Sequence, residues 1–184
     1  MREKSIVGQK VALRPWKSSD AKAMKLLAND RTIARFTSVP FPYRVKHARD
    51  FIRRARKGFR DETELCYAIT LKETGEAAGS ASLIGIVKRH GKAEIGYWLG
   101  KSFRRKGLAR ESVQLLLRLA FNKMKLNRVV IKCNVSNERS RKIIEGTGAR
   151  FEGIEREGAI NGLGKKHDTR VYSILAREFR ESLK

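Results

Sequence analysis

The sequence predicts a single α/β domain built on a mixed sheet, and two features carry this prediction. Three extended segments at 65–71, 78–86 and 93–99 are separated by short polar turns that contain glycine, a pattern typical of an antiparallel meander. Strand, helix, strand and helix then follow in that order, which implies a parallel crossover. A length of 184 residues suits one domain, and no repeat or proline-rich linker divides 1–184.

The segments before the meander predict one strand and two helices. Apolar and polar residues alternate over 11–14, and the cap residues at 18–20 precede a helix that runs through about Ala28. Over 45–59 apolar residues recur at helical spacing, while basic residues take most other positions. This basic amphipathic helix either packs on the core with a solvated back or also binds RNA. The apolar stripe alone explains the spacing, which favours packing.

After the meander, one long helix is expected from about Gly107 to Met124, because its apolar residues form a single face. A strand rich in β-branched residues follows at 128–134, and Ser136-Asn137 caps a short helix that ends near Gly146 or Gly148. The last expected elements are strands at 149–158 and 167–174, around the turn Asn161-Gly162-Leu163-Gly164, and a short polar helix at 176–183.

The composition indicates a folded protein rather than a disordered or membrane-spanning one. Hydrophobic residues make up 41% of the chain and charged residues 33%, and no stretch approaches the roughly 18 apolar residues of a membrane span. The amino terminus lacks a secretory pattern, so a cytoplasmic location without a membrane partner is expected. Cys66 and Cys133 are expected as buried reduced thiols in strands, and the scattered histidines support no metal site.

The net charge of +23 is the most prominent compositional feature. A field of this sign attracts polyanions or acidic surfaces, which makes RNA, a ribosome or an acidic protein a plausible partner. Residues 1–60 contain 17 Lys and Arg but 4 Asp and Glu, so the excess is concentrated in the first third. A thermophilic origin would explain part of the number of charges but not their sign.

The segment 94–109 contains the most informative pattern. A strand leads into a loop with three consecutive cations, and the loop opens directly into an amphipathic helix. The first turn of a helix offers unpaired N–H groups and the positive end of its dipole, and Gly107 and Ala109 leave the backbone open. The sequence therefore predicts a nucleotide-like pyrophosphate at this turn. A dinucleotide fingerprint is absent, and 158–166 fails the P-loop pattern because Leu163 replaces its second glycine.

The remaining pattern, Arg104-x-x-Gly107-x-Ala109, resembles the R/Q-x-x-G-x-G/A signature of the GNAT superfamily of N-acetyltransferases. It is preceded by Ile95-Gly96-Tyr97-Trp98-Leu99 and followed by Asn137-Glu138-Arg139-Ser140 and Gly148-Ala149-Arg150-Phe151-Glu152-Gly153, in the order seen in the Rim-type branch that acetylates ribosomal-protein N-termini. The resemblance implies a mostly antiparallel sheet, flanked by helices, with a V-shaped splay between two parallel central strands. It also implies acetyl-CoA as cosubstrate.

The resemblance also assigns expected roles to individual residues. Trp98 and Leu99 would pair their backbone with the pantetheine arm inside the splay, Asn137 would bond the same arm, and the Ser140 side chain would lie near the thioester sulfur. Asn137 has a second interpretation as a plain helix cap, and the two roles can coexist. The pyrophosphate would be bound by the turn residues Arg104, Arg105, Lys106, Gly107, Leu108 and Ala109.

Acetyl transfer needs a group that removes a proton from the amine and one that protonates the departing thiolate. Glu94 is the candidate base, with a surface carboxylate at a strand start as the alternative, and Ser140 or Tyr97 is the candidate acid. Tyr97 is equally well interpreted as a core residue. A backbone N–H near Leu99 would polarise the carbonyl. Ala149 departs from the family, which usually has an aromatic residue there.

The favoured acceptor is the N-terminal amine of a protein, with a ribosomal protein as the leading case. The alternatives are a small amine such as an antibiotic or metabolite, and a non-catalytic module on the same fold that binds RNA or the ribosome. The turn at 161–164 is either a simple turn or a mobile lip over the acceptor cleft. Both a monomer and a homodimer are compatible with the sequence.

Overall fold

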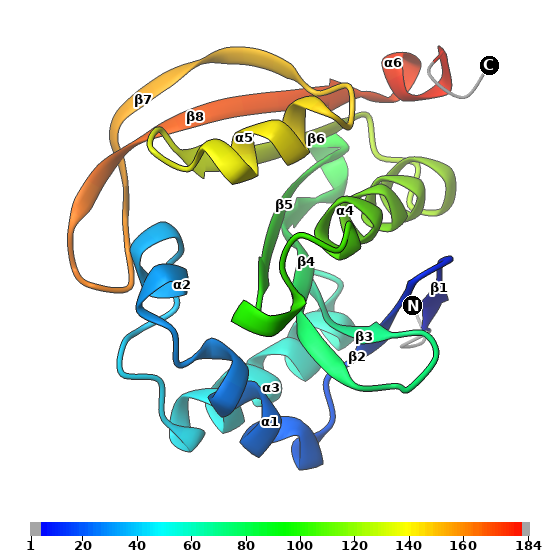
Figure 1. The fold of residues 1–184 in the computed structure, drawn as a ribbon. Coiled ribbons are helices and arrows are strands. Elements are labelled where there is room, and N and C mark those ends of the chain that lie inside the picture. Colours follow the sequence, from blue (N-terminus) through cyan, green and yellow to red (C-terminus); the bar gives the residue numbers. More distant parts are fainter. Residues whose placement is uncertain (1–4, 182–184) are drawn as a thin grey trace.

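A mixed sheet of eight strands forms the centre of the computed structural model, which describes residues 5–181 (Figure 1). The strands are β1 Ile6–Val7, β2 Val11–Pro15, β3 Leu65–Leu71, β4 Ala77–Val87, β5 Lys92–Leu99, β6 Arg128–Asn134, β7 Arg150–Ile160 and β8 Lys166–Leu175. They lie in the order β1-β2-β3-β4-β5-β6-β8-β7. Only β5 and β6 run parallel within this sheet, and every other neighbouring pair is antiparallel. The predicted mixed, mostly antiparallel sheet is confirmed.

Helices cover both faces of the sheet. They are α1 Ala21–Ala28, α2 Arg31–Phe36, α3 Val45–Asp61, α4 Leu108–Arg118, α5 Glu138–Glu145 and α6 Ala176–Glu181. The larger apolar cluster joins α4 to strand residues such as Leu83 and Ile131, whereas a smaller cluster joins α1 and α3 to Ala68 and Trp98. Adjacent strand residues point to opposite faces, so α4 lies on one face and α1 with α3 on the other.

The long helix predicted from Gly107 to Met124 is divided in the structure. The α-helix ends at Arg118 and continues as a π-helical turn over Leu119–Lys123. Three consecutive residues of this turn, 119–121, are buried. The turn is closed by the bond from Met124 N–H to Leu119 O at 2.9 Å, which spans five residues, as a π-helical turn requires.

Two elements of the structure were not predicted from the sequence. The short strand β1 pairs with β2, and helix α2 starts at a cap in which Asp30 accepts the Thr32 N–H at 2.7 Å. The predicted last helix is present as α6, and its expected end at Leu183 lies outside the described residues. Within residues 5–181, no helix combines the length and apolar character needed to cross a membrane.

Candidate functional site

The two parallel strands separate along their length. β5 and β6 pair only from Lys92↔Arg128 to Ile95↔Ile131. Beyond this point residues 96–99 of β5 pair with β4 alone, and residues 132–134 of β6 pair with β8 alone. The expected V-shaped splay is therefore present, with backbone groups facing the gap on both arms. An extended ligand can bond to such an edge in the manner of an added strand.

Tyr97 and Ser140, the two candidate acids, meet across the splay. The Tyr97 hydroxyl lies 2.8 Å from Ser140 Oγ, and either atom can donate the proton. Ser140 stands in the first turn of α5, where Asn137 Oδ1 accepts its N–H at 3.2 Å. This bond confirms Asn137 as a helix cap. Burial raises the pKa of Tyr97 to about 12, although the bond to Ser140 opposes the shift, so Tyr97 keeps its proton at neutral pH.

Both cysteines are free and buried, as the sequence predicts. Cys133 lies on the β6 arm of the splay and approaches Ser140. Burial raises the pKa of the Cys133 thiol, while the nearby Arg170 guanidinium opposes the shift. Burial also raises the pKa of Cys66 to about 12. Both side chains are therefore neutral thiols at physiological pH.

Glu94, the candidate base, projects from the opposite face of β5. It is half-buried, and this burial raises its pKa, while the ammonium group of Lys132 lowers it and the carboxylate of Glu155 raises it further. Lys132 Nζ itself lies 2.9 Å from both Glu155 oxygens. The structure thus brings Tyr97 and Ser140 together on one face and places Glu94 on the other. A carboxylate with a raised pKa is suited to accept a proton from an amine.

The turn before α4 has the geometry of an anion site. Gly107 is the N-cap residue with a φ of +80°, and Arg105 is also left-handed with a φ of +65°. Among the described residues, no acceptor bonds the backbone N–H groups of residues 105–110, and the first bond of the helix joins Glu111 N–H to Gly107 O. Several donors and the positive end of an eleven-residue helix therefore face the same region.

Arg104 uses its side chain to hold the turn in place. Its Nε donates to Leu99 O at 3.1 Å, and its Nη2 lies 2.5 Å from Asp30 Oδ2 at the start of α2. Burial tends to raise the pKa of Asp30, but the Thr32 N–H and the Arg104 guanidinium lower it overall. Arg105 and Lys106 are exposed beside the turn. A pyrophosphate at this turn would meet their charges, whereas Arg104 would position the backbone.

Lys10 is a residue of this region that the sequence did not reveal. Its Nζ lies 3.8 Å from the position that a Cβ atom on Gly107 would take. The Glu111 carboxylate accepts the Lys10 N–H at 3.0 and 3.1 Å, which fastens the β1–β2 turn to the first turn of α4. No local sequence signal links Lys10 to a helix that begins almost a hundred residues later.

A cavity of about 580 Å³ lies between α2 and the turn that joins β7 to β8. In Figure 1 the β7–β8 hairpin curves away from the other strands toward α2. Gly162 N–H donates to Ala34 O at 2.8 Å and to Thr37 O at 2.7 Å. These bonds fix the turn on α2, so it is a docked turn and not a free lip. The cavity is lined by Arg31, Arg35, Phe41, Asn134, Asn161, Gly162, Leu163, Lys165 and Lys166.

Gly162→Ala is expected to detach this turn, because a Cβ atom at Gly162 would lie 1.7 Å from Val39 O. We expect a loss of about 2 kcal/mol in the free energy of unfolding, measured by urea denaturation. Gly164→Ala is the control: its φ is +77° but nothing lies within 4 Å of the added atom, so only about 1 kcal/mol of backbone strain is expected. Equal losses for both variants would contradict the docking.

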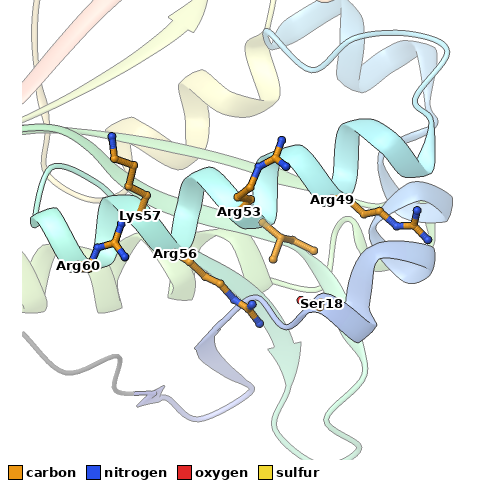
Figure 2. A pocket seen from close by; sticks show the side chains of 7 residues that line it. Ser18, Arg49, Arg53, Arg56, Lys57 and Arg60 are labelled. Atoms are coloured by element: carbon orange, nitrogen blue, oxygen red, sulfur yellow. The ribbon is translucent and has the colours of Figure 1, made fainter.

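The exposed side of α3 forms a basic ridge, shown in Figure 2. A second cavity, of about 690 Å³, lies along it. Asp50 pairs with Arg53 at 2.6 Å, and Asp61 lies 3.9 Å from Lys57 and 3.5 Å from Arg60, so the cations outnumber the carboxylates. The opposite side of the helix is buried, which confirms the predicted amphipathic helix. The α3 ridge consists of Arg49, Arg53, Arg56, Lys57 and Arg60.

Comparison with known families finds a match over most of the chain. The profile of the Acetyltransferase (GNAT) domain family matches residues 10–150. A putative ribosomal N-acetyltransferase, YdaF of Bacillus subtilis (strain 168), is 41% identical over 106 residues, a stretch that spans 57% of this chain and 57% of that protein. The match thus covers little more than half the length of that relative.

Two further relatives match nearly the whole chain. The uncharacterized N-acetyltransferase p20 of Bacillus licheniformis is 29% identical over 171 residues, which cover 93% of this chain and 96% of that protein. The crystal structure of the microcin C7 self-immunity acetyltransferase MccE, in complex with acetyl-CoA and AMP, superposes with a TM-score of 0.82. Its sequence is 25% identical, and the alignment covers 91% of this chain and 93% of that one.

Proposed function

The chain belongs to the GNAT family of acetyltransferases, and from this premise we propose that it transfers an acetyl group from acetyl-CoA to the N-terminal amine of a protein, with a ribosomal protein as the acceptor. The observation that carries the chemistry is the splay between β5 and β6, with the Tyr97–Ser140 pair inside it and the open N–H groups of residues 105–110 beside it. The acceptor is inferred from the similarity to YdaF.

The residues of the turn fit the anionic end of acetyl-CoA. The N–H groups of residues 105–110 and the cations Arg105, Lys106 and Lys10 match a pyrophosphate in charge and in donor geometry. The free edge of β5 fits the amide groups of the pantetheine arm, where Leu99 would offer its backbone and Asn137 its side chain. The backbone of Trp98, which is opposite Ser80 in the ladder, faces β4, as does the Gly100 N–H that donates to Ala78 O. When bound, acetyl-CoA supplies the activated acyl group.

The protein then contributes proton transfer and orientation. Glu94 accepts the proton of the incoming amine, directly or through water, and its raised pKa brings it closer to the operating pH. A backbone N–H near Leu99 polarises the carbonyl. Tyr97, which remains protonated at neutral pH, donates to the departing thiolate together with Ser140, to which it is hydrogen bonded.

Tyr97→Phe is expected to lower kcat about tenfold or more while the KM for acetyl-CoA changes little, because the ring still packs but the proton donor is lost. Ser140→Ala should have a similar effect. Since the two groups act through one hydrogen bond, the double variant is expected to lose little more than the worse single variant. Steady-state kinetics measures this. Fully multiplicative losses would show that the two hydroxyls act independently.

The acceptor is tested by incubating the enzyme and acetyl-CoA with purified ribosomal proteins and, in parallel, with a panel of small amines. Intact-mass spectrometry is expected to show one added acetyl group on a ribosomal protein, and tandem spectra should place it on the terminal amine. Modification of small amines alone would reject the protein acceptor. Binding of acetyl-CoA without transfer to any amine would favour a non-catalytic module.

The α3 ridge supports a related proposal, that the enzyme works close to RNA. Arginines dominate the ridge, and their guanidinium groups match phosphate oxygens in pairs. Wild-type protein is expected to co-sediment with ribosomal RNA at low salt and to dissociate as salt rises. Arg49→Glu combined with Arg56→Glu should weaken this association without changing transfer to a free peptide. Unchanged co-sedimentation would remove the ridge from the proposal.

A further inference from the structure

The cavity between α2 and the β7–β8 turn, called here the cationic pocket, carries four positive side chains and no carboxylate in its lining. Arg31 and Arg35 come from α2, Lys165 comes from the turn, and Lys166 is the first residue of β8. Among the residues that the structure describes, only Lys166 of these four pairs with a carboxylate, that of Glu157 at 3.1 Å. The pocket therefore presents a positive potential that the protein itself leaves largely uncompensated.

The cationic pocket adjoins the splay in which we place the reaction. Asn134, one of its lining residues, ends the β6 arm of the splay. Since Glu94 pairs with Val130 and alternate strand residues share a face, Lys132 and Asn134 lie on the same face as Glu94. Lys132 is the first residue of β6 that no longer pairs with β5, and Asn134 stands two residues further on, about 7 Å along the strand. A peptide whose amine lies in the splay would thus pass the pocket within its next few residues.

We propose that the cationic pocket binds acidic side chains of the acceptor, so that the enzyme selects N-termini with Asp or Glu among their first four residues. This inference rests on the proposed transfer to a protein N-terminus and names the class of peptide that the same site accepts. Arg31 and Arg35 present guanidinium groups from one wall, and the two lysines present ammonium groups from the other. Carboxylates passing between them meet donors on both sides.

Two further contacts favour a peptide as the occupant. Asn134 Oδ1 accepts from the Ser136 N–H and hydroxyl at 2.8 and 2.7 Å, whereas no acceptor among the described residues bonds the amide nitrogen of Asn134, which is free to bond a peptide carbonyl. The Arg31 guanidinium lies 6.0 Å from the centre of the Phe41 ring, which limits its motion. The bonds of Gly162 to α2 fix the distance between the two charged walls.

The test compares three peptides of equal length that all begin with serine and differ only at positions two to four. These positions carry Asp and Glu in the acidic peptide, Asn and Gln in the neutral peptide, and Lys and Arg in the basic peptide. We expect kcat/KM to be at least tenfold higher for the acidic peptide than for the neutral one and lowest for the basic one. The difference should shrink as salt is raised, because the charged groups at the rim of the pocket are screened.

The charge-reversed variant Arg35→Glu with Lys165→Glu is expected to invert this order, improving the basic peptide and impairing the acidic one. Both side chains are exposed, so little packing is lost, and a thermal melt checks the fold. If the double variant is unstable, Lys165→Glu alone should reduce the preference. Arg89→Glu is the control, matched in charge to Lys165→Glu alone, because it reverses one charge in the exposed β4–β5 connection, at the other end of β5 from the splay.

Each outcome decides the inference. Equal rates for the acidic and neutral peptides would overturn it while leaving transfer to protein N-termini intact. A failure to acetylate any peptide would overturn both. If the wild-type enzyme acetylates a phosphate-bearing small amine faster than the acidic peptide, and the charge-reversed variant loses this activity, the pocket binds a small anionic acceptor instead. An inverted preference in the variant, with Arg89→Glu unchanged, supports the acidic peptide.

Discussion

Gly107→Glu is expected to abolish coenzyme A binding, with a dissociation constant at least a hundredfold higher than that of the wild-type protein. The φ of +80° at Gly107 penalises any side chain by roughly 1–2 kcal/mol. The added carboxylate would also stand at the positive end of α4, where it would compete with a phosphate for the open N–H groups of residues 105–110. Isothermal titration calorimetry with coenzyme A measures the loss directly.

Gly107→Ala separates the two contributions. It carries the same backbone penalty but no charge, so we expect a loss of about tenfold, well short of that caused by glutamate. Lys10→Gln adds a second check, because its ammonium group is the nearest atom to the site of a Gly107 Cβ, and its removal should weaken binding by a few-fold. Wild-type affinity in Gly107→Glu would show that the diphosphate binds elsewhere and would refute the assignment of this turn.

The part of the site that the sequence predicts is the part made by neighbouring residues. The turn before α4 combines glycine, cations and the start of an amphipathic helix within a few residues, so its anion-binding geometry follows from local rules. Asn137 likewise caps α5 as its place after a strand predicts. The meander, the crossover and the amphipathic α3 were predicted because each depends on periodicity over a short stretch.

The remainder depends on contacts between distant segments, and no local pattern encodes these. The side chain of Arg104, read from the sequence as a phosphate ligand, turns instead to Asp30 of a helix that was not predicted. Helix α2 is only six residues long, too short for a helical period to stand out. The docked turn at Gly162 requires knowledge that the β7–β8 hairpin reaches α2, which only the folded chain provides.

Glu94→Gln is expected to lower kcat by about 10² to 10³-fold and to remove the acidic limb of its pH profile. A general base acts only when ionised, so activity falls as the pH drops through the pKa of Glu94. Burial raises that pKa, so the limb should lie above the ordinary value of 4.5. Because a raised pKa in the folded state makes the ionised form less favourable, Glu94→Gln should not destabilise the fold near neutral pH. Rate profiles and a thermal melt separate these effects.

Glu155→Gln tests the cause of the raised pKa of Glu94. The Glu155 carboxylate raises the pKa of Glu94, and it also binds Lys132, whose ammonium group lowers that pKa. Removing the Glu155 charge eliminates the first effect and releases Lys132 to strengthen the second, so the acidic limb should move to lower pH while kcat at neutral pH is retained. If Glu94→Gln keeps kcat within threefold and leaves the limb in place, Glu94 is a surface carboxylate and another group removes the proton.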